Sequence, residues 1–289
     1  MASGMTRRQA NHLAGMRVAR GVFGTDRVAA LLAAAGPDAV LCGVTALRLA
    51  GVDLPARLAR DLRVWIQVPS SQSWPDRPEV RLVRSDQVRP RRIIKGLPCV
   101  RLGYCWLQLA DEASVDELVE LADALTRRQR PVTTKQVLDN AIATSPRMRG
   151  LAKAKQALAL CVEGTDSIPE TDLRLLLVRA GLPQPTVNLL VIGPSGSPRY
   201  WMDLGYEEQL VGVEYDGSYH ADGTGQMQRD IIRLRNLEDW GWRIIRVSGA
   251  DLYGANPGVI VDSVRLELAR RRRGDSRSGM QLDTSRSLT

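Results

Sequence analysis

The chain has 289 residues, of which 44% are hydrophobic and 25% charged, a length and composition typical of a folded protein with two ordinary domains. No apolar run reaches the roughly 18–20 residues that cross a bilayer, and the basic start lacks an apolar signal segment, so we expect a cytoplasmic protein without membrane contact. A formal net charge of +8 is compatible with a polyanionic partner, and four scattered cysteines without Cys-x-x-Cys spacing indicate buried thiols rather than zinc or disulfides.

Residues 1–163 predict an α+β domain in which two helices are followed by strands and then by a helical run. Apolar periodicity indicates helices, and short runs that alternate or end at turn formers indicate strands. The expected helices cover residues 25–35 and 39–55, and the expected strands cover residues 62–68, 80–83 and 96–100.

A helical run completes this first domain. Ser114 and Thr133 each open a capping box, with Glu or Gln three residues later, so we expect helices to start there. Another helix is expected from Ser145 to near Cys161. No spacing in this domain is typical of a catalytic site, and His12, its one histidine, is expected to be a solvent-exposed bystander.

The pattern changes at residue 164, where a second domain is expected to begin and to extend to residue 262. Its predicted order is helix, three strands, helix, strand, which gives a mixed α/β fold. The expected elements are a helix over 169–180, strands over 187–192, 199–204 and 210–215, a helix over 225–239 and a strand over 242–247. Residues 263–289 carry part of the positive charge, and we expect a disordered tail that is either solvated or in contact with phosphates.

Acidic residues stand at the ends of neighbouring apolar strands in this second domain. Asp203 interrupts one strand, and Glu214 and Asp216 end the next. A carboxylate in an apolar strand is costly unless it is paired or bound to metal, so we expect Asp203 and Glu214 to hold a divalent cation, with Asp216 as a third ligand. The alternatives are a salt bridge from Asp203 to an arginine, a solvent-facing Glu214 and an ordinary Asp-Gly turn at Asp216.

Other polar residues near these acids are candidates for supporting roles. Glu170 has capping-box spacing and is either a helix cap or an outer ligand that orients water. His220 follows the acids in a polar loop and is a candidate general acid or base, or simply solvated. Arg229 and Arg233 share a face of the next helix, where they either hold the scissile phosphate or form a solvated charged face.

These residues match a known set of motifs, found here in order: Glu170, Asp203, Glu214-Tyr-Asp216-Gly217-Ser-Tyr-His220, Arg229-Asp230-Ile-Ile-Arg233 and Gly241-Trp-Arg-Ile-Ile-Arg246. The chain resembles the PD-(D/E)XK nuclease superfamily here, in particular its very-short-patch-repair-like endonuclease branch. The resemblance implies an αβββαβ restriction-endonuclease-like core with a mixed four-stranded sheet. Asp216 stands where the superfamily usually has lysine, so His220 or a second metal must replace the lysine, or the domain is inactive.

The N-terminal part resembles the abortive-infection antitoxin family of the AbiEi type. The matching segments are Arg17–Phe23, Gly36–Pro55 and Leu118–Leu125. Members of that family commonly begin with a winged helix that binds DNA. Only about sixteen residues precede Arg17, so this domain is expected to be truncated or absent.

The two resemblances and the acidic cluster lead to one main hypothesis and one alternative. The main hypothesis is a metal-dependent DNA endonuclease with Mg²⁺, or Mn²⁺ in its place, as cofactor and without a small-molecule cofactor, serving phage defence or DNA repair. The alternative is a DNA-binding regulator or antitoxin of a type IV toxin–antitoxin system with an inactive nuclease-like domain. A neighbouring gene for a nucleotidyltransferase-type toxin would favour the alternative.

Overall fold

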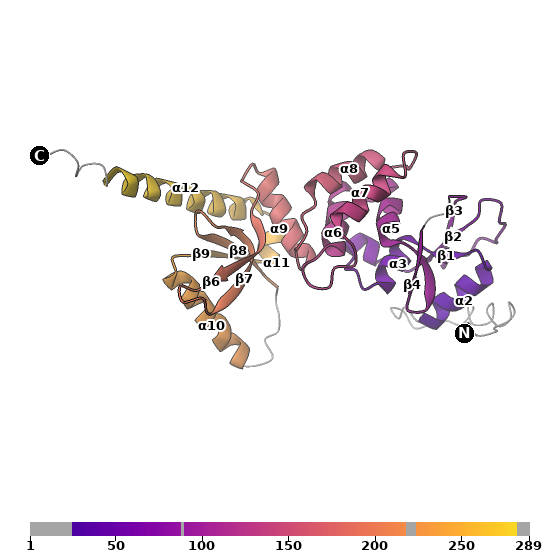
Figure 1. Cartoon of the computed structure of the whole chain (residues 1–289), viewed down its shortest axis with the longest axis horizontal. Coiled ribbons are helices and arrows are strands. Elements are labelled where there is room, and N and C mark those ends of the chain that lie inside the picture. The colour runs from indigo at the N-terminus through magenta and orange to yellow at the C-terminus, as the bar shows by residue number, and fades with distance from the viewer. Residues whose placement is uncertain (1–24, 88–89, 218–223, 282–289) are drawn as a thin grey trace, which may run out of the picture. The chain divides into compact units, whose positions relative to one another are not determined.

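The computed structural model describes residues 25–87, 90–217 and 224–281. His12, the segment Arg17–Phe23 and His220 lie outside these residues. The protein divides into two compact units, Met1–Glu163 and Gly164–Thr289. Each unit combines helices with one mixed β-sheet, so the mixed α/β class predicted from the sequence is confirmed (Figure 1). Within the described residues, no helix has both the length and the apolar character that a membrane crossing requires.

The N-terminal unit is built on a five-stranded sheet with the order β3-β2-β1-β5-β4. The pairs β1–β2 and β4–β5 are antiparallel, whereas β1–β5 and β2–β3 are parallel. The strands are β1 (Val40–Leu41), β2 (Val64–Val68), β3 (Val80–Arg84), β4 (Arg91–Ile94) and β5 (Leu97–Val100). Strand β2 is buried along its whole length because it lies inside the sheet with helices α2 (Thr25–Ala35) and α3 (Gly43–Leu49) against it.

The long helix expected over 39–55 is wrong at both ends, because α3 covers only Gly43–Leu49. Residues Val40–Leu41 form strand β1, which fills the centre of the sheet between β2 and β5. Helix α3 starts only at Gly43, which has a positive φ of 47° and lies so close to the ring of Trp65 that a Cβ atom would collide with it. Pairing with distant strands therefore overrides the local helical pattern of this segment.

Helices complete the N-terminal unit after the sheet. They are α4 (Ala56–Ala59), α5 (Leu102–Gln108), the 3₁₀ turn η1 (Leu109–Asp111), α6 (Val115–Leu125), α7 (Lys135–Ala143) and α8 (Leu151–Leu160). The capping box at Ser114 is confirmed, whereas the cap of α7 is Thr134, one residue later than expected. Helix α8 starts six residues later than predicted, because Gly150 before it has a left-handed φ of 74° that ends the preceding turn.

The C-terminal unit has a four-stranded sheet with the order β6-β7-β8-β9. The pairs β6–β7 and β7–β8 are antiparallel, and β8–β9 is parallel. The strands are β6 (Thr186–Ile192), β7 (Arg199–Tyr206), β8 (Val211–Asp216) and β9 (Arg243–Ser248), and the helices are α9 (Ile168–Arg179), α10 (Thr224–Asp239), α11 (Gly249–Tyr253) and α12 (Gly258–Gln281).

Helices cover both faces of this sheet (Figure 1). Leucines of α9 and apolar residues of α11 and α12 pack on one face against Leu204, Val213 and Val247. Leu237 of α10 packs on the other face with Met202 and Trp242. Helix α12 continues through residue 262 as far as Gln281, so the tail expected to be disordered from residue 263 is helical over most of its length. The apolar residues of α12 that join the core explain why this segment folds as a helix.

Candidate active site

The candidate active site lies where strand β7 is irregular. Leu204 and Tyr206 contribute to the core under α9 and α12, but Met202, two residues before Leu204, contributes to the core under α10. Side chains two apart in a regular strand share a face, so the alternation of β7 is interrupted at Asp203. The neighbouring strand deviates at the same level, because Asn188 has a positive φ of 44° and the register passes from Val187–Leu204 to Leu189–Met202.

At this irregularity the side chain of Asp203, and not a backbone carbonyl, accepts the hydrogen bond from the backbone N–H of Tyr215 in β8. The β7–β8 ladder ends at the pair Leu204–Val213, one residue away from Asp203 and Glu214, and the charge of Glu214 acts on Asp203. Asp203 Oδ2 accepts a hydrogen bond of 2.9 Å from the backbone N–H of Tyr215. This bond orients the carboxylate between the two separating strands.

Glu214 is buried on the face of the sheet that α10 covers, with an exposed fraction of 6%. Its two carboxylate oxygens each accept a hydrogen bond of 2.6 Å from the terminal nitrogens of Arg233 in α10. Such a bidentate pair is the strong form of a charge-assisted hydrogen bond. The solvent-facing alternative for Glu214 is therefore wrong.

The charges of these residues are coupled. Burial, together with repulsion from Glu170 and Glu214, raises the pKa of Asp203 to about 7, although the N–H of Tyr215 and the guanidinium of Arg233 lower it. The hydrogen bonds to Glu214 raise the pKa of Arg233, and the charge of Asp203 adds to the effect. Arg233 therefore acts as the shared cation of Asp203 and Glu214.

Glu170 combines its capping role with a place beside this cluster. It is buried, and its Oε1 accepts a hydrogen bond of 2.8 Å from Ser167 Oγ while its Oε2 accepts one of 2.9 Å from the N–H of Asp166. Burial raises the pKa of Glu170 despite these bonds. Ser167 is the N-cap of α9, and Glu170 accepts from the residue before that cap and from the cap's hydroxyl. The charge of Glu170 also raises the pKa of Asp203.

The other predicted site residues lie elsewhere or outside the described residues. Asp216 forms an exposed ion pair of 2.6 Å with Arg246 and not with Arg233. Arg229 is exposed one turn before Arg233 on α10. The phosphate-binding role of Arg233 does not match its contacts, because both terminal nitrogens of its guanidinium already bind Glu214. His220 falls outside the residues that the structure describes.

Asn188 is a site residue that the sequence analysis missed. Its side chain is buried, donates a hydrogen bond of 2.6 Å to the carbonyl of Gly164 and hydrogen-bonds with Glu170. It connects the irregular part of β6 with the start of α9. A polar residue within the otherwise apolar run Thr186–Ile192 is the signal that would have found it.

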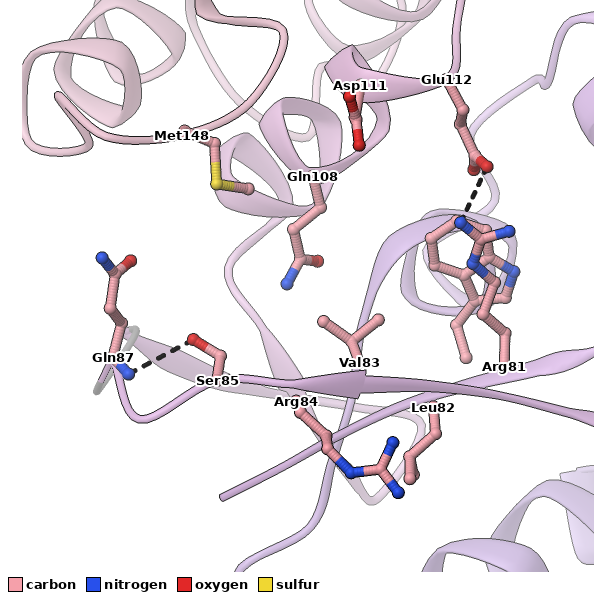
Figure 2. Close-up of a pocket in the computed structure, with 11 residues that line it drawn as sticks. Arg81, Leu82, Val83, Arg84, Ser85, Gln87, Gln108, Asp111, Glu112 and Met148 are labelled. Carbon is pink, nitrogen blue, oxygen red and sulfur yellow. Dashed lines mark hydrogen bonds and ion pairs between the residues drawn. The ribbon is translucent and has the colours of Figure 1, made fainter. Parts of the chain in front are cut away.

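A pocket in the N-terminal unit is the main rival to this site. It has a volume of about 310 Å³ and lies between β3 and the end of α5 (Figure 2). Three of its polar residues are engaged with the protein itself: Arg81 forms an ion pair of 2.9 Å with Glu112 and lies 4.4 Å from the ring centroid of Trp65, and Gln108 donates to Gln67.

Comparisons with known proteins give relatives without an established role. The chain is 26% identical over 246 residues to two uncharacterized proteins of Mycobacterium tuberculosis, one from strain CDC 1551 / Oshkosh and one from strain ATCC 25618 / H37Rv. In each case the match covers 84% of this chain and 82% of the relative. No family model and no solved structure matches the chain.

Proposed function

We propose that the C-terminal unit is a metal-dependent endonuclease that hydrolyses phosphodiester bonds in DNA. The observation that carries the proposal is the half-buried Asp203 beside the buried Glu214, where the paired residues of β7 and β8 end at Leu204–Val213. A cluster of acids that raises the pKa of one member to about 7 is typical of catalytic and cation-binding sites. The order α9, β6, β7, β8, α10, β9 also agrees with the αβββαβ core that the resemblance implies.

The carboxylates of Asp203 and Glu214 are chemically suitable ligands for Mg²⁺. Among the described residues, no three His, Cys, Asp or Glu side chains form a group that could hold a metal ion. Mg²⁺ is usually held through one or two carboxylates, with water and substrate phosphate completing its shell, so Asp203 and Glu214 suffice. When bound, Mg²⁺ would polarise the phosphate and lower the pKa of a bound water.

The residues of the chain have distinct roles in this proposal. Asp203 and Glu214 would hold the ion, and the N–H of Tyr215 fixes the orientation of Asp203. Glu170 would support the site as a neighbouring buried charge that favours a cation at Asp203. Arg233 balances the charge of Glu214 in the protein without an ion, and a bound ion would compete with it for the oxygens of Glu214.

Titration of Mg²⁺ and Mn²⁺ into the protein with labelled duplex, mismatched and single-stranded DNA tests the proposal. We expect metal-dependent cleavage that falls by at least about 100-fold in Asp203→Asn and in Glu214→Gln. The matched controls Asp262→Asn and Glu208→Gln change exposed acids of the same unit and should retain activity. Undiminished cleavage by both site variants would exclude this active site.

A DNA-binding regulator or antitoxin with an inactive nuclease fold is the second candidate. It is favoured by the contacts of the acids, because Arg233 binds both oxygens of Glu214 and Arg246 binds Asp216. This candidate expects DNA binding that chelator does not change, with no cleavage in either metal. Calorimetry of metal binding distinguishes the nuclease from the inactive regulator. The nuclease should bind Mg²⁺ or Mn²⁺, whereas a fold whose acids are neutralised by ion pairs should bind neither ion.

A further inference from the structure

The positive charge of the protein is concentrated in the N-terminal unit. Of the 40 Lys and Arg residues, 25 lie in residues 1–163 together with 15 of the 32 Asp and Glu residues. Residues 164–289 contain 15 basic and 17 acidic residues, so this unit is net negative even with its basic C-terminal helix. A polyanion is therefore attracted to the unit that does not contain the candidate active site.

Part of this charge lies on the edge hairpin of the five-stranded sheet. Strands β4 and β5 are joined by the two residues Lys95 and Gly96, and β4 is an edge strand (Figure 1). Residues 90–101 contain four basic residues and no acidic one: Arg91, Arg92, Lys95 and Arg101. All four are exposed, whereas Ile94, Cys99 and Val100 are buried and fix the hairpin to the unit.

The basic residues of the hairpin differ in their contacts from three arginines of the unit that are paired with acids. Arg57, Arg81 and Arg127 form ion pairs with carboxylates. In the part of the chain that the structure describes, Arg92 and Lys95 have no carboxylate partner, and Arg91 donates only to the carbonyl of Asp38. Their charges are thus available to an external anion.

The turn of the hairpin supports a role for its lysine. Lys95 and Gly96 have φ angles of 49° and 80°, as a type I′ turn requires. Asparagine, aspartate and glycine are the usual residues at the first position of such a turn, because other side chains crowd the backbone there. Lysine at this position makes the turn less stable than asparagine or glycine would, and it places an ammonium group at the tip of the hairpin.

Edge protection is the simplest alternative explanation for these charges. Charged side chains on an edge strand prevent pairing with other chains, and either sign of charge serves that purpose. Here all four charges are positive, and the exposed side chain of Ile93, at 66%, lies among them. The single sign favours a polyanionic partner over protection alone.

We propose that the basic hairpin, defined as Arg91, Arg92, Lys95 and Arg101, binds the phosphate backbone of duplex DNA. The choice of DNA rests on the proposed function, but the binding needs neither the metal nor an intact active site. Contacts to phosphates are independent of base sequence and weaken with salt. The hairpin therefore supplies general affinity and leaves the chemistry to the C-terminal unit.

The test is DNA binding by the full chain in EDTA, measured by fluorescence anisotropy over a series of KCl concentrations. Each lost phosphate contact lowers the slope of log K against log salt by about 0.9, so Arg92→Gln, Lys95→Gln and Arg101→Gln together should lower it by about 2 to 3. The matched control replaces three other exposed basic residues of the unit with Gln and should keep the wild-type slope: Arg60, Arg147 and Arg149.

Each outcome decides the proposal. An equal loss in both triple variants, or no loss in either, would overturn it and leave total charge or edge protection as the explanation. Arg92→Lys with Arg101→Lys keeps the charges and should restore binding, which excludes a folding defect. Polyglutamate that competes as well as duplex DNA at equal charge would overturn DNA as the partner. If the protein binds DNA through the basic hairpin but does not cleave it, the result contradicts the proposed nuclease and leaves the proposed DNA binding intact.

Discussion

Asp203→Asn should stabilise the C-terminal unit at high pH. Asp203 is half-buried beside two other carboxylates, so its charged form is unfavourable in the folded protein. Asparagine has nearly the same shape, and its side-chain oxygen can still accept the hydrogen bond from the N–H of Tyr215. The substitution therefore removes a repulsive charge while it keeps the contact that joins β7 to β8.

The size and the pH range of the effect follow from the pKa. The pKa of Asp203 rises from 3.8 to about 7 on folding. Between these values the folded protein binds more protons at this site than the unfolded chain, so the stability of the wild-type protein falls as pH rises. One pKa unit corresponds to about 1.4 kcal/mol, which gives a loss of roughly 4 kcal/mol that is complete above pH 7 and absent below about pH 4.

Urea unfolding at several pH values between 4.5 and 8, followed by hydrogen exchange in peptides of β7 and β8, measures this effect in the C-terminal unit alone. Asp203→Asn should be more stable than wild type at pH 8, and the difference should shrink toward pH 4.5. The control Asp262→Asn changes a carboxylate that is 77% exposed and should alter stability by less than about 0.5 kcal/mol. A constant difference between Asp203→Asn and wild type at all pH values would refute the reasoning.

Three further substitutions test other contacts. Arg233→Gln leaves Glu214 buried without its cation, and the C-terminal unit should lose about 3 kcal/mol at pH 8 in urea unfolding; a loss below about 0.5 kcal/mol would show that the pair does not stabilise the fold. Ser114→Ala removes the capping box of α6, and urea unfolding should show a loss of about 1 kcal/mol in the N-terminal unit. Lys95→Asn should raise the stability of that unit by up to about 1 kcal/mol and weaken DNA binding, and an unchanged DNA affinity would speak against the basic hairpin.

Local patterns predicted the elements that depend on local interactions. Helix α2 has the bounds expected from its Ala- and Leu-rich run, and Ser114 caps α6 as predicted. The strands of the C-terminal unit lie within about two residues of their expected positions. Strand β1 was missed because its two residues owe their conformation to partners more than 20 residues away in the sequence.

The acids of the site were predictable, whereas their partners were not. An acid in an apolar strand and another at the end of the next strand predicted that Asp203 and Glu214 would lie near each other, and the charge of Glu214 does act on Asp203. Their shared role in holding an ion stays a prediction. The bidentate contact of Arg233 with Glu214 depends on the rotation of α10 over the sheet, which sequence spacing does not fix. The role of Asn188 likewise depends on an irregularity shared by two strands.

The contact between Arg233 and Glu214 links the stability of the fold to the proposed chemistry. The carboxylates of Asp203 and Glu214 repel each other, and the guanidinium of Arg233, which is paired with Glu214, compensates this charge in the protein without an ion. A divalent ion offers the same compensation, so ion and guanidinium compete for the oxygens of Glu214. Metal affinity in a working nuclease is then reduced by the strength of this pair, and Arg233→Gln should bind Mn²⁺ more tightly than wild type in calorimetry. In a fold that has lost the metal site, the same substitution costs stability and gains no affinity.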